Sequence, residues 1–410
     1  MSNQINQSAK LQKIDFQKLQ KPAKNNQIIF MKSIAILGST GSIGKSTLNV
    51  IRNNAHNFKV KLLVAGKDHQ TLVSQALEFH PEIIVIENIA FLPELKSALQ
   101  STKIKVLGGF EAVLEVTKIK YDLMVSAIVG SAGMLPTLNA IRVGTNIALA
   151  NKESLVCAGE FLMAEAKKNN VMIIPVDSEH NAIFQIFEND NLSLIEEVVL
   201  TASGGPFFNS SKNFANISID EALKHPRWQM GAKISIDSAT MMNKGLEMIE
   251  AFHLFPITKK QIKILVHPQS IIHGMVNYAD GSSLAMMSVP DMQIPIAFAI
   301  NYPKRMKIKH QKLDLCAIKN LEFFEVDEKK FLAIKICRQV LESEGNAPVI
   351  LNASNEVAVD RFLKSQITFD KIPLVVLETL NKIPFKKLES IDDVLSNDQM
   401  ARQIAQKISV

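Results

Sequence analysis

The 410-residue chain has only three cysteines, Cys157, Cys316 and Cys337, and no two of them form a C-x-x-C pair. Cysteines that are scattered and odd in number argue against a disulfide framework and against a thiolate zinc site. They indicate a protein that works in a reducing compartment.

The chain also lacks a hydrophobic run long enough to span a bilayer. Its most apolar stretch, "SLAMMSVPDMQIPIAFAI", is broken by two prolines and by Asp291. Aromatic residues make up 6% of the chain. Of the formal charge of +6, residues 1–30 carry +4, from five lysines and one aspartate, which leaves +2 for the rest. This distribution disfavours nucleic acid and membranes as partners and suits a small anionic ligand.

Residues 1–30 are rich in Gln, Asn and Lys and contain no apolar segment. This composition argues against a secretory signal and predicts a disordered tail before Met31. Because the segment has no arginine and little serine, plastid-type targeting is disfavoured against a bacterial cytoplasmic location.

From Met31 onward, short apolar runs alternate with segments that can form helices. Such alternation predicts a parallel sheet covered on both faces, which is an α/β fold. The predicted strands are "SIAILG", "KVKLLVAG", "EIIVIE", "KIKVLGG", "DLMVSAIVG", "NIALAN" and "VMIIPV".

The first of these strands runs into a glycine-rich loop, "GSTGSIGKST". A Walker-type phosphate loop ending in Gly44-Lys45-Ser46 would require glycine at position 39, which is serine. The alternative is a dinucleotide turn, Gly38-x-x-Gly41-x-x-Gly44, between a strand and a helix. The strand–helix context favours the dinucleotide turn.

Beyond residue 177 the pattern changes to a mixture of strands and helices. Asp280-Gly281 lies between two apolar runs and predicts an antiparallel hairpin. An irregular stretch begins at about residue 289, and helical periodicity follows from about 328, where Ser390 and Asp393 could cap the last helix. We expect a Rossmann-like domain (31–177), an α+β catalytic and dimerisation domain (178–300), a linker (301–327) and a C-terminal helical bundle (328–410).

The residues after the second strand bear on the choice between NAD and NADP. An enzyme that prefers NAD carries an acid there, which binds the ribose 2′-hydroxyl. Here Lys67 and His69 could balance a 2′-phosphate, which favours NADPH, although Asp68 lies between them. A solvated loop is the alternative for these residues.

Two groups of polar residues suggest a metal site. Asp177 and Glu179 follow a predicted strand, and two residues apart in extended chain they would face the same side. Asn243, Lys244 and Glu247 would share one face of a helix. Three carboxylates without a cysteine suit Mg²⁺ or Mn²⁺. The alternative is that Asp177 and Glu179 only cap a helix that begins near His180.

The segment 204–231 is a candidate flap. It begins within "TASGGPF" (201–207), where Ser203 could bind a phosphate, and it contains Trp228, the only tryptophan. Its glycines, prolines and polar residues predict that it buries little and moves. A lone tryptophan is more often part of a core, but in this polar context it could close over a substrate.

Taken together and in order, several motifs resemble the 1-deoxy-D-xylulose 5-phosphate reductoisomerase family over residues 32–365 or so. They are "GSTGSIG", "ANKESLV", "PVDSEHNAIFQ", "TASGGPF", "HPRWQMG", "KISIDSATMMNKGLE", "HPQSIIHGMV" and "LNASNEVAV". The resemblance implies a homodimer whose subunit has three regions. It also implies NADPH-dependent rearrangement and reduction of 1-deoxy-D-xylulose 5-phosphate to 2-C-methyl-D-erythritol 4-phosphate, in the non-mevalonate isoprenoid pathway.

The resemblance also assigns residues to roles. NADPH would contact Thr40, Gly41, Ser42, Ile43, Gly66, Lys67, Asp68, Asn151, Glu153 and Gly231, although Asp68 stands where the family commonly has asparagine. One divalent ion would be held by Asp177, Glu179 and Glu247, which with Lys152 form the catalytic set. The substrate would be held by Lys152, Ser178, Glu179, Ser203, His225, Ser238, Asn243, Lys244 and Glu247. Of these, Ser203, Ser238, Asn243 and Lys244 would bind its phosphate, and Trp228 and Met230 would lie on the flap.

Two other functions are compatible with the residues alone. One is a different NADP-dependent oxidoreductase of a phosphorylated sugar, which would need no metal ion. The other is a non-catalytic NADP-binding sensor, which would need no convergent carboxylates.

Overall fold

The computed structural model describes residues 31–410 except Arg227 and Gln229. The predicted tail, residues 1–30, lies outside this range. Within it, no helix is long and apolar enough to cross a membrane.

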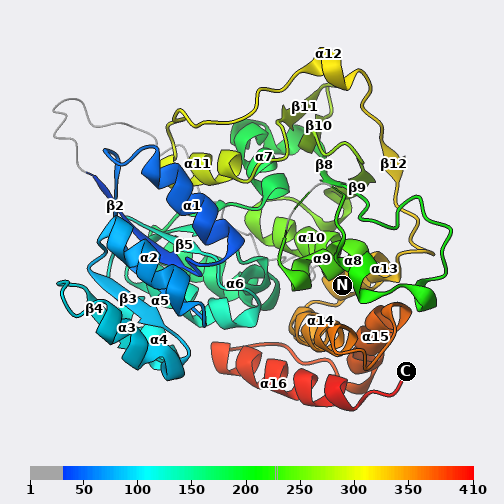
Figure 1. The fold of residues 1–410 in the computed structure, drawn as a ribbon. Helices are drawn as coiled ribbons and strands as arrows, with labels where there is room; N and C mark the ends of the chain where they lie inside the picture. Colours follow the sequence, from blue (N-terminus) through cyan, green and yellow to red (C-terminus); the bar gives the residue numbers. More distant parts are fainter. Residues whose placement is uncertain (1–30, 227, 229) are drawn as a thin grey trace, which may run out of the picture.

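The first half of the chain forms a parallel sheet of seven strands, and every strand predicted there is present (Figure 1). The strand order is β4-β3-β2-β1-β5-β6-β7. The chain order therefore reverses between β1 and β5, which is the point where open α/β sheets bind their ligands. The strands are β1 (Lys32–Leu37), β2 (Phe58–Ala65), β3 (Ile83–Ile86), β4 (Lys105–Gly108), β5 (Leu123–Ser126), β6 (Asn146–Leu149) and β7 (Ile173–Pro175).

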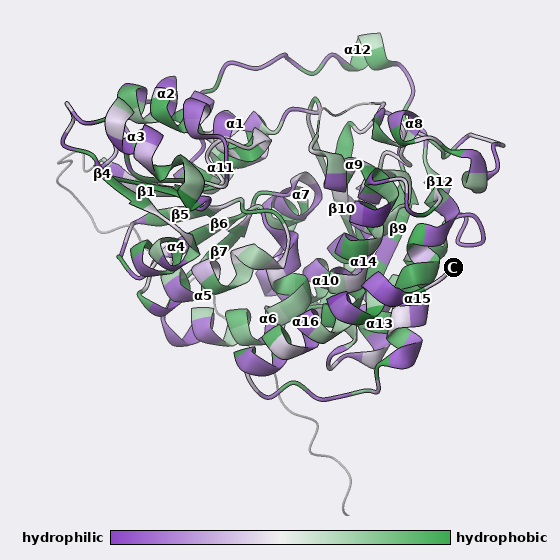
Figure 2. Cartoon of the chain, turned by 60° about the horizontal axis from the view of Figure 1, so that its bottom comes forward, coloured by the Kyte–Doolittle hydropathy of each residue, from purple (hydrophilic) through white to green (hydrophobic). Residues whose placement is uncertain are grey.

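Helices cover both faces of this sheet because its strands are apolar on both sides. One face packs against α1 (Ser42–Arg52), α2 (His69–Phe79) and α3 (Leu92–Ala98). The other packs against α4 (Phe110–Val116), α5 (Met134–Arg142) and α6 (Lys152–Lys168). Figure 2 shows strands such as β1 and β5 as mostly hydrophobic. The expected Rossmann-like sheet architecture is confirmed.

A second sheet of five strands follows, in the order β11-β10-β8-β9-β12. Its strands are β8 (Ile195–Ala202), β9 (Ile262–Val266), β10 (Ile272–Tyr278), β11 (Ser283–Met287) and β12 (Phe324–Glu325). β10 and β11 form the predicted antiparallel hairpin. At its turn Gly281 has a φ of +87°, a conformation that favours glycine.

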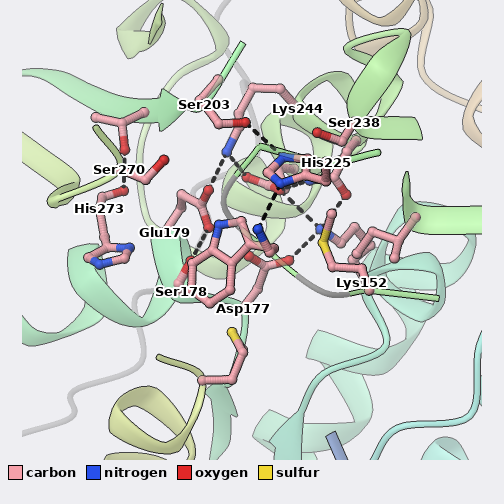
Figure 3. A pocket seen from close by; sticks show the side chains of 18 of the residues that line it. Lys152, Asp177, Ser178, Glu179, Ser203, His225, Ser238, Lys244, Ser270 and His273 are labelled. Atoms are coloured by element: carbon pink, nitrogen blue, oxygen red, sulfur yellow. Dashed lines mark hydrogen bonds and ion pairs between the residues drawn. The ribbon is translucent and has the colours of Figure 1, made fainter. Parts of the chain in front are cut away.

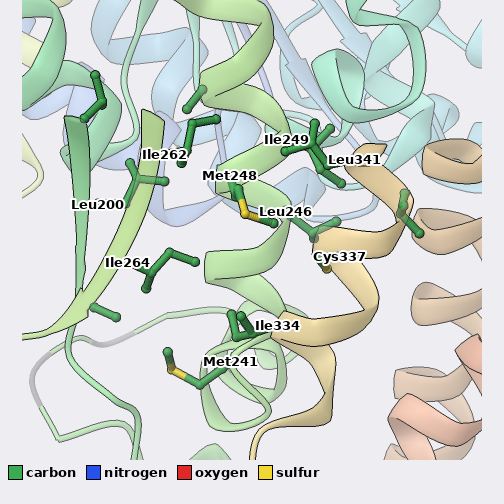
Figure 4. Close-up of a cluster of buried hydrophobic side chains, with 14 of the residues drawn as sticks. Leu200, Met241, Leu246, Met248, Ile249, Ile262, Ile264, Ile334, Cys337 and Leu341 are labelled. Carbon is green, nitrogen blue, oxygen red and sulfur yellow. The ribbon is translucent and has the colours of Figure 1, made fainter. Parts of the chain in front are cut away.

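A hydrophobic core joins the second sheet to two helices, α10 (Met242–Leu254) and α13 (Leu332–Ser343). In Figure 4, Leu200 and Ile264 of the sheet point toward Met248 of α10, and α13 packs behind it with Cys337. Gly245 is required at this contact, since a Cβ there would lie 2.4 Å from the Cys337 sulfur. α10 is therefore held firmly between the sheet and α13.

The prediction of an irregular chain from about residue 289 is wrong over α11 (Gln293–Asn301). Ile296 and Ile300 of this helix are buried against the first sheet, beside α1. Apolar residues in this stretch therefore return to the first sheet in spite of the prolines. The chain then continues with little regular structure through α12 (Leu315–Ile318) to β12.

The C-terminal part is helical, as predicted, and α13 is followed by α14 (Ala347–Leu363), α15 (Ile372–Lys382) and α16 (Ile391–Lys407). Ser390 and Asp393 form the predicted capping box of α16. In Figure 2, α16 alternates between hydrophobic and hydrophilic residues, as a helix with one buried face should. The remaining helices are α7 (Ser178–Ile186), α8 (Ile219–Leu223) and α9 (Ala232–Ala239).

Candidate active site

The glycine turn joins β1 to α1, and its three glycines differ in what surrounds them. Gly38 has a φ of +79°, and a Cβ there would lie 2.4 Å from the Ala127 carbonyl oxygen at the end of β5. A Cβ on Gly44 would lie 2.4 Å from the Gly38 carbonyl oxygen, whereas one on Gly41 would have only that oxygen as a neighbour, at 3.3 Å. Gly38 and Gly44 are thus needed for the turn and for helix packing, and Gly41 leaves room for a ligand.

The turn also presents unpaired backbone donors. Gly41 is the N-cap of α1 and has no side chain to occupy the first N–H groups, and the first turn of α1 contains no acid. Such a helix N-terminus is suited to an anion. Lys45, which a Walker loop would direct at the phosphates, is exposed on α1. The geometry therefore supports the dinucleotide interpretation.

Three other cofactor candidates lie beyond the end of β2. Gly66 and Lys67 are exposed in the loop to α2. Asp68 is the N-cap of α2 and accepts a hydrogen bond from the Thr71 N–H at 3.1 Å. His69 Nε2 lies 2.8 Å from a Glu94 carboxylate oxygen. Asp68 and His69 thus have structural partners, and Lys67 is an exposed cation in the same loop.

Asn151 and Glu153 lie where β6 leads into α6. The Asn151 amide donates to the Gly130 carbonyl oxygen at 2.8 Å, and its oxygen caps α6 at the Ser154 N–H. Asn151 thereby ties the loop after β5 to the start of α6. Glu153 is buried and accepts from Lys233 Nζ at 2.7 Å.

Nearby, the structure encloses a cavity of about 220 Å³ at the carboxyl edge of the first sheet. Its lining includes the whole predicted substrate set and two cofactor candidates of the glycine turn: Ser42, Ile43, Lys152, Ser178, Glu179, Ser203, His225, Ser238, Asn243, Lys244 and Glu247. Figure 3 shows Lys152, Glu179, Ser203, His225 and Lys244 gathered around this cavity. Asp177, Trp228 and Met230 line it as well. The other cofactor candidates, Thr40, Gly41, Gly66, Lys67, Asp68, Asn151, Glu153 and Gly231, are not among the lining residues.

The three predicted metal ligands converge. Oxygen atoms of Asp177, Glu179 and Glu247 lie within 4.8 Å of one another. The expectation that Asp177 and Glu179 share extended chain is wrong, since Glu179 is in the first turn of α7 and Asp177 is its N-cap. Within the described residues, the Asp177 side chain makes no capping hydrogen bond and pairs with Lys152 instead. A capping role therefore does not explain Asp177.

Two buried lysines balance these acids. Lys152 Nζ lies 3.0 Å from Glu247, and Lys244 Nζ lies 2.7 Å from Glu179. Burial and the neighbouring Glu247 raise the pKa of Glu179 to about 8. Burial also acts to raise the pKa of Asp177, but the positive charge of Lys152 and other neighbouring groups together outweigh burial and lower that pKa. If all three acids were ionised, they would exceed the two ammonium groups by one negative charge, and an all-oxygen donor set of this kind fits Mg²⁺ or Mn²⁺.

A second group in the cavity is arranged around His225. Burial lowers the pKa of His225 to about 4, so the ring is neutral at pH 7. Nδ1 accepts from the Trp228 N–H at 2.9 Å, which assigns the ring proton to Nε2, 3.0 Å from Ser203 Oγ. Ser203 Oγ also accepts from the Gly205 N–H at 3.2 Å. The Ser203 hydroxyl proton is then available to an anion in the cavity.

The expectation that segment 204–231 buries little is wrong for its first part. Phe207, Ile217 and Ala222 are buried, and Phe207 packs edge-on against Phe369 with ring centroids 5.4 Å apart. α8 begins with a capping box at Ser218. A movable flap would therefore be confined to the residues after α8.

Sequence reasoning did not single out several residues at the site. Ser270 and His273 line the cavity, and Ser270 has a φ of +52°, which is unusual for serine and marks local backbone strain. His180 Nε2 lies 2.8 Å from the Glu247 carbonyl oxygen and Nδ1 lies 3.2 Å from Glu250. The two histidines of "HPQSIIH" could have indicated His273 from the sequence. No sequence pattern indicated that His180 would pair with Glu250.

The glycine turn at the switch point and the buried carboxylates beside it define an α/β enzyme of the dinucleotide-dependent class. The chain belongs to the 1-deoxy-D-xylulose 5-phosphate reductoisomerase family. Residues 34–159 match the family model described as 1-deoxy-D-xylulose 5-phosphate reductoisomerase. Residues 173–255 match the 1-deoxy-D-xylulose 5-phosphate reductoisomerase C-terminal domain, and residues 287–404 match the DXP reductoisomerase C-terminal domain.

Curated relatives and solved structures agree. The chain is 45% identical to the 1-deoxy-D-xylulose 5-phosphate reductoisomerases of Rhodospirillum centenum (92% of this chain, 94% of the relative) and Wolbachia pipientis (92% and 97%). The Zymomonas mobilis enzyme in complex with NADPH is 40% identical, with a TM-score of 0.87 over 92% of this chain and 98% of that one. A DOX-P reductoisomerase in complex with NADPH, fosmidomycin and magnesium is 39% identical, with a TM-score of 0.86 over 92% and 97%.

Proposed function

We propose that this chain converts 1-deoxy-D-xylulose 5-phosphate to 2-C-methyl-D-erythritol 4-phosphate, with NADPH as reductant and one divalent ion, Mg²⁺ or Mn²⁺. The observation that carries the proposal is the convergence of Asp177, Glu179 and Glu247 in a cavity bordered by the glycine turn. The chain's family membership supports it, as do the solved relatives with NADPH and magnesium.

NADPH would lie along the carboxyl edge of the first sheet. Its pyrophosphate would bind the N–H groups of Ser42 and Ile43 at the start of α1, where Thr40 and Gly41 leave space. Lys67 would balance the 2′-phosphate, and Asp68 would act through the shape of its loop. Gly231, around which a Cβ would meet nothing within 4 Å, together with Asn151 and Glu153 would border the nicotinamide end.

A divalent ion held by Asp177, Glu179 and Glu247 would supply Lewis acidity to the ketone of the substrate. Lys152 would orient the substrate oxygens and stabilise the negative charge that develops during the rearrangement. Its ammonium is fixed by the Asn243 side-chain oxygen at 2.8 Å and by Glu247 at 3.0 Å. Ser178, whose hydroxyl lies 2.5 Å from Glu179, would complete this side of the substrate site.

The substrate phosphate would bind beside this charged group, toward Ser203 and Ser238. Ser203 and Ser238 would donate hydroxyl protons, Asn243 an amide, and Lys244 a positive charge. The neutral ring of His225 supports this, because its Nε2–H leaves the Ser203 proton free to donate.

Trp228 and Met230 line the same cavity, and we propose that they close over the bound substrate. Because Trp228 is the only tryptophan, the fluorescence signal has a single source. Emission should change, and protease cleavage between 223 and 231 should be suppressed, when a phosphonate substrate analogue binds. A fixed loop would show neither effect.

We further propose a homodimer formed through the region 178–300, working in a bacterial cytoplasm. β11 supports the dimer because it is the outer strand of the second sheet and exposes Leu284. The bacterial relatives and three free thiols are consistent with the location. Leu284→Lys should shift the molecular mass measured by light scattering from two chains toward one. An unchanged mass would move the interface elsewhere.

The function is tested by following NADPH oxidation with 1-deoxy-D-xylulose 5-phosphate, with and without Mg²⁺. Turnover that a chelator abolishes and Mg²⁺ restores is the expected result. Turnover that survives the chelator would indicate an oxidoreductase without a metal requirement. NADPH binding without turnover would indicate a sensor.

A further inference from the structure

Lys233 is a half-buried cation at the junction of three helices. Its Nζ lies 2.7 Å from Glu153 on α6 and 2.8 Å from Asp237 on α9. Asp237 in turn accepts from the Asn355 amide of α14 at 2.8 Å. One ammonium therefore links the helix that follows β6, the helix that follows segment 204–231, and a C-terminal helix.

The position of Lys233 within its own helix is unfavourable. It is the second residue of α9, where the positive end of the helix dipole repels a cation, and the first turn of α9 contains no acid. Asp237, one turn later, offsets part of this cost. A lysine placed against the local preference points to a partner outside the helix, and that partner is Glu153.

Glu153 requires such a partner to remain an acceptor. Burial acts to raise the pKa of Glu153, but the charge and hydrogen bond of Lys233, with smaller contributions from a backbone hydrogen bond and Lys152, lower that pKa. The other carboxylate oxygen accepts from the Asn151 amide at 3.1 Å. An ionised carboxylate only accepts hydrogen bonds, so of the groups on NADPH it suits hydroxyl or carboxamide donors and not the phosphates.

The same lysine lies next to the expected lid. Gly231 precedes α9, Met230 and Ile234 line the cavity, and Lys233 lies between them in sequence. The ion pair between Lys233 and Glu153 of α6 therefore holds the end of segment 204–231 against the cofactor side of the cavity.

We propose that Lys233 is a positioning residue for NADPH, which holds Glu153 in place to receive a hydroxyl or carboxamide donor of the cofactor and anchors the end of segment 204–231 to α6. The proposal rests on the function proposed above. It predicts that loss of Lys233 weakens NADPH binding specifically, since the partner carboxylate is left buried without its counter-charge.

The test compares Lys233→Met with Lys212→Met. Lys212 belongs to the same segment but pairs with Glu221 at the surface, at 2.5 Å, where ion pairs contribute little. We expect Lys233→Met to raise the Kd of NADPH, measured by fluorescence without substrate, and the KM for NADPH about tenfold. kcat and the KM for 1-deoxy-D-xylulose 5-phosphate should change less than about threefold. Lys212→Met should leave all four constants unchanged.

Two further variants separate positioning from simple stabilisation. Lys233→Arg keeps the charge and should recover most of the NADPH affinity. In a double-mutant cycle, Lys233→Met should add little to the loss caused by Glu153→Gln. If Lys233→Met does not fold, Lys233→Gln replaces it with the same expectation.

An unchanged NADPH Kd, additive effects in the cycle, or a parallel loss of kcat and of affinity for both substrates would overturn the proposal. Because the Kd is measured without turnover, the role of Lys233 is tested even if the wild-type protein does not act on 1-deoxy-D-xylulose 5-phosphate.

Discussion

The two sides of the cavity are built from different kinds of group. On the cofactor side, the turn from β1 to α1 presents glycines and backbone N–H groups at the open edge of the sheet. On the substrate side, charged side chains from α6, α7 and α10 neutralise one another away from water. The first site is thus defined by the path of the backbone and the second by charge balance.

This difference predicts opposite sensitivities. A substitution that keeps the shape of a side chain but removes its charge should damage the substrate side, whereas the glycine turn from β1 to α1 offers no side-chain charge to lose. The addition of one methyl group should do the reverse, because it alters the path of the backbone but no charge. The following experiments test that contrast.

Glu247→Gln should have the largest effect, because the shape is kept and the charge is lost. Without this carboxylate, one metal ligand and a partner of Lys152 disappear. We expect kcat to fall about a thousandfold, or about 4 kcal/mol of transition-state stabilisation, with the NADPH Kd changed less than about threefold. Near-normal turnover of this variant at saturating Mn²⁺ would show that Glu247 is not a metal ligand. Glu196→Gln, on the surface of β8, is the control.

Gly38→Ala should have the next largest effect. The new Cβ would lie 2.4 Å from the Ala127 carbonyl oxygen at a φ of +79°. We expect about 2–4 kcal/mol less free energy of unfolding, from left-handed strain and overpacking, and weak NADPH binding. Gly66→Ala, whose nearest neighbour would be 3.9 Å away, should keep its stability and lose only cofactor affinity. Equal melting temperatures for the two variants would contradict this account of the turn.

The same contrast explains what the sequence could predict. The seven strands and the glycine turn are local patterns of apolar runs and glycine spacing, and the structure confirms them. α11 was missed because its role is to cover a sheet formed by residues far earlier in the chain.

On the substrate side, the residue types indicated the metal ligands, but the backbone geometry assumed for them was wrong. Asp177 and Glu179 converge through a helix start, and the assumed extended chain is wrong. Lys233 and Glu153 are 80 residues apart, so no spacing rule could pair them. Charge balance in a buried site is a property of the tertiary fold, which a linear pattern does not contain.

Two buried histidines, one inside and one outside the cavity, should both make the stability of the fold depend on pH. Burial lowers the pKa of His253, outside it, and of His273, inside it, to about 4. The usual value is about 6.5, so between these pH values the unfolded chain binds more protons than the native one. The contribution of each neutral histidine to the free energy of unfolding is complete above pH 6.5 and is lost as the pH falls toward 4.

Replacing either histidine by glutamine should flatten this decline by up to about 3 kcal/mol, in chemical unfolding followed from pH 7 to pH 4. His253→Gln should flatten the decline in stability without changing kcat/KM. His273→Gln should flatten the decline and also change kcat/KM, because His273 lines the cavity. His56→Gln, at an exposed position, should leave the slope unaltered. A slope that neither buried variant changes would mean that other groups control acid unfolding.

Lys67→Ala should have the smallest effect, because Lys67 is exposed and its contact with a 2′-phosphate would be screened by water. Lys67 lies just beyond the carboxyl end of β2, and Lys59 lies near the amino end of the same strand. Since ligands bind at carboxyl ends, only the first should matter. We expect Lys67→Ala to lower the preference for NADPH over NADH about tenfold, mainly through the KM for NADPH, and more strongly at low salt. Lys59→Ala should leave the preference unchanged. If both variants keep the NADPH preference of the wild type, Lys67 does not discriminate between NADPH and NADH. The charge of this exposed lysine would then matter even less to cofactor binding than the contrast with the substrate side predicts.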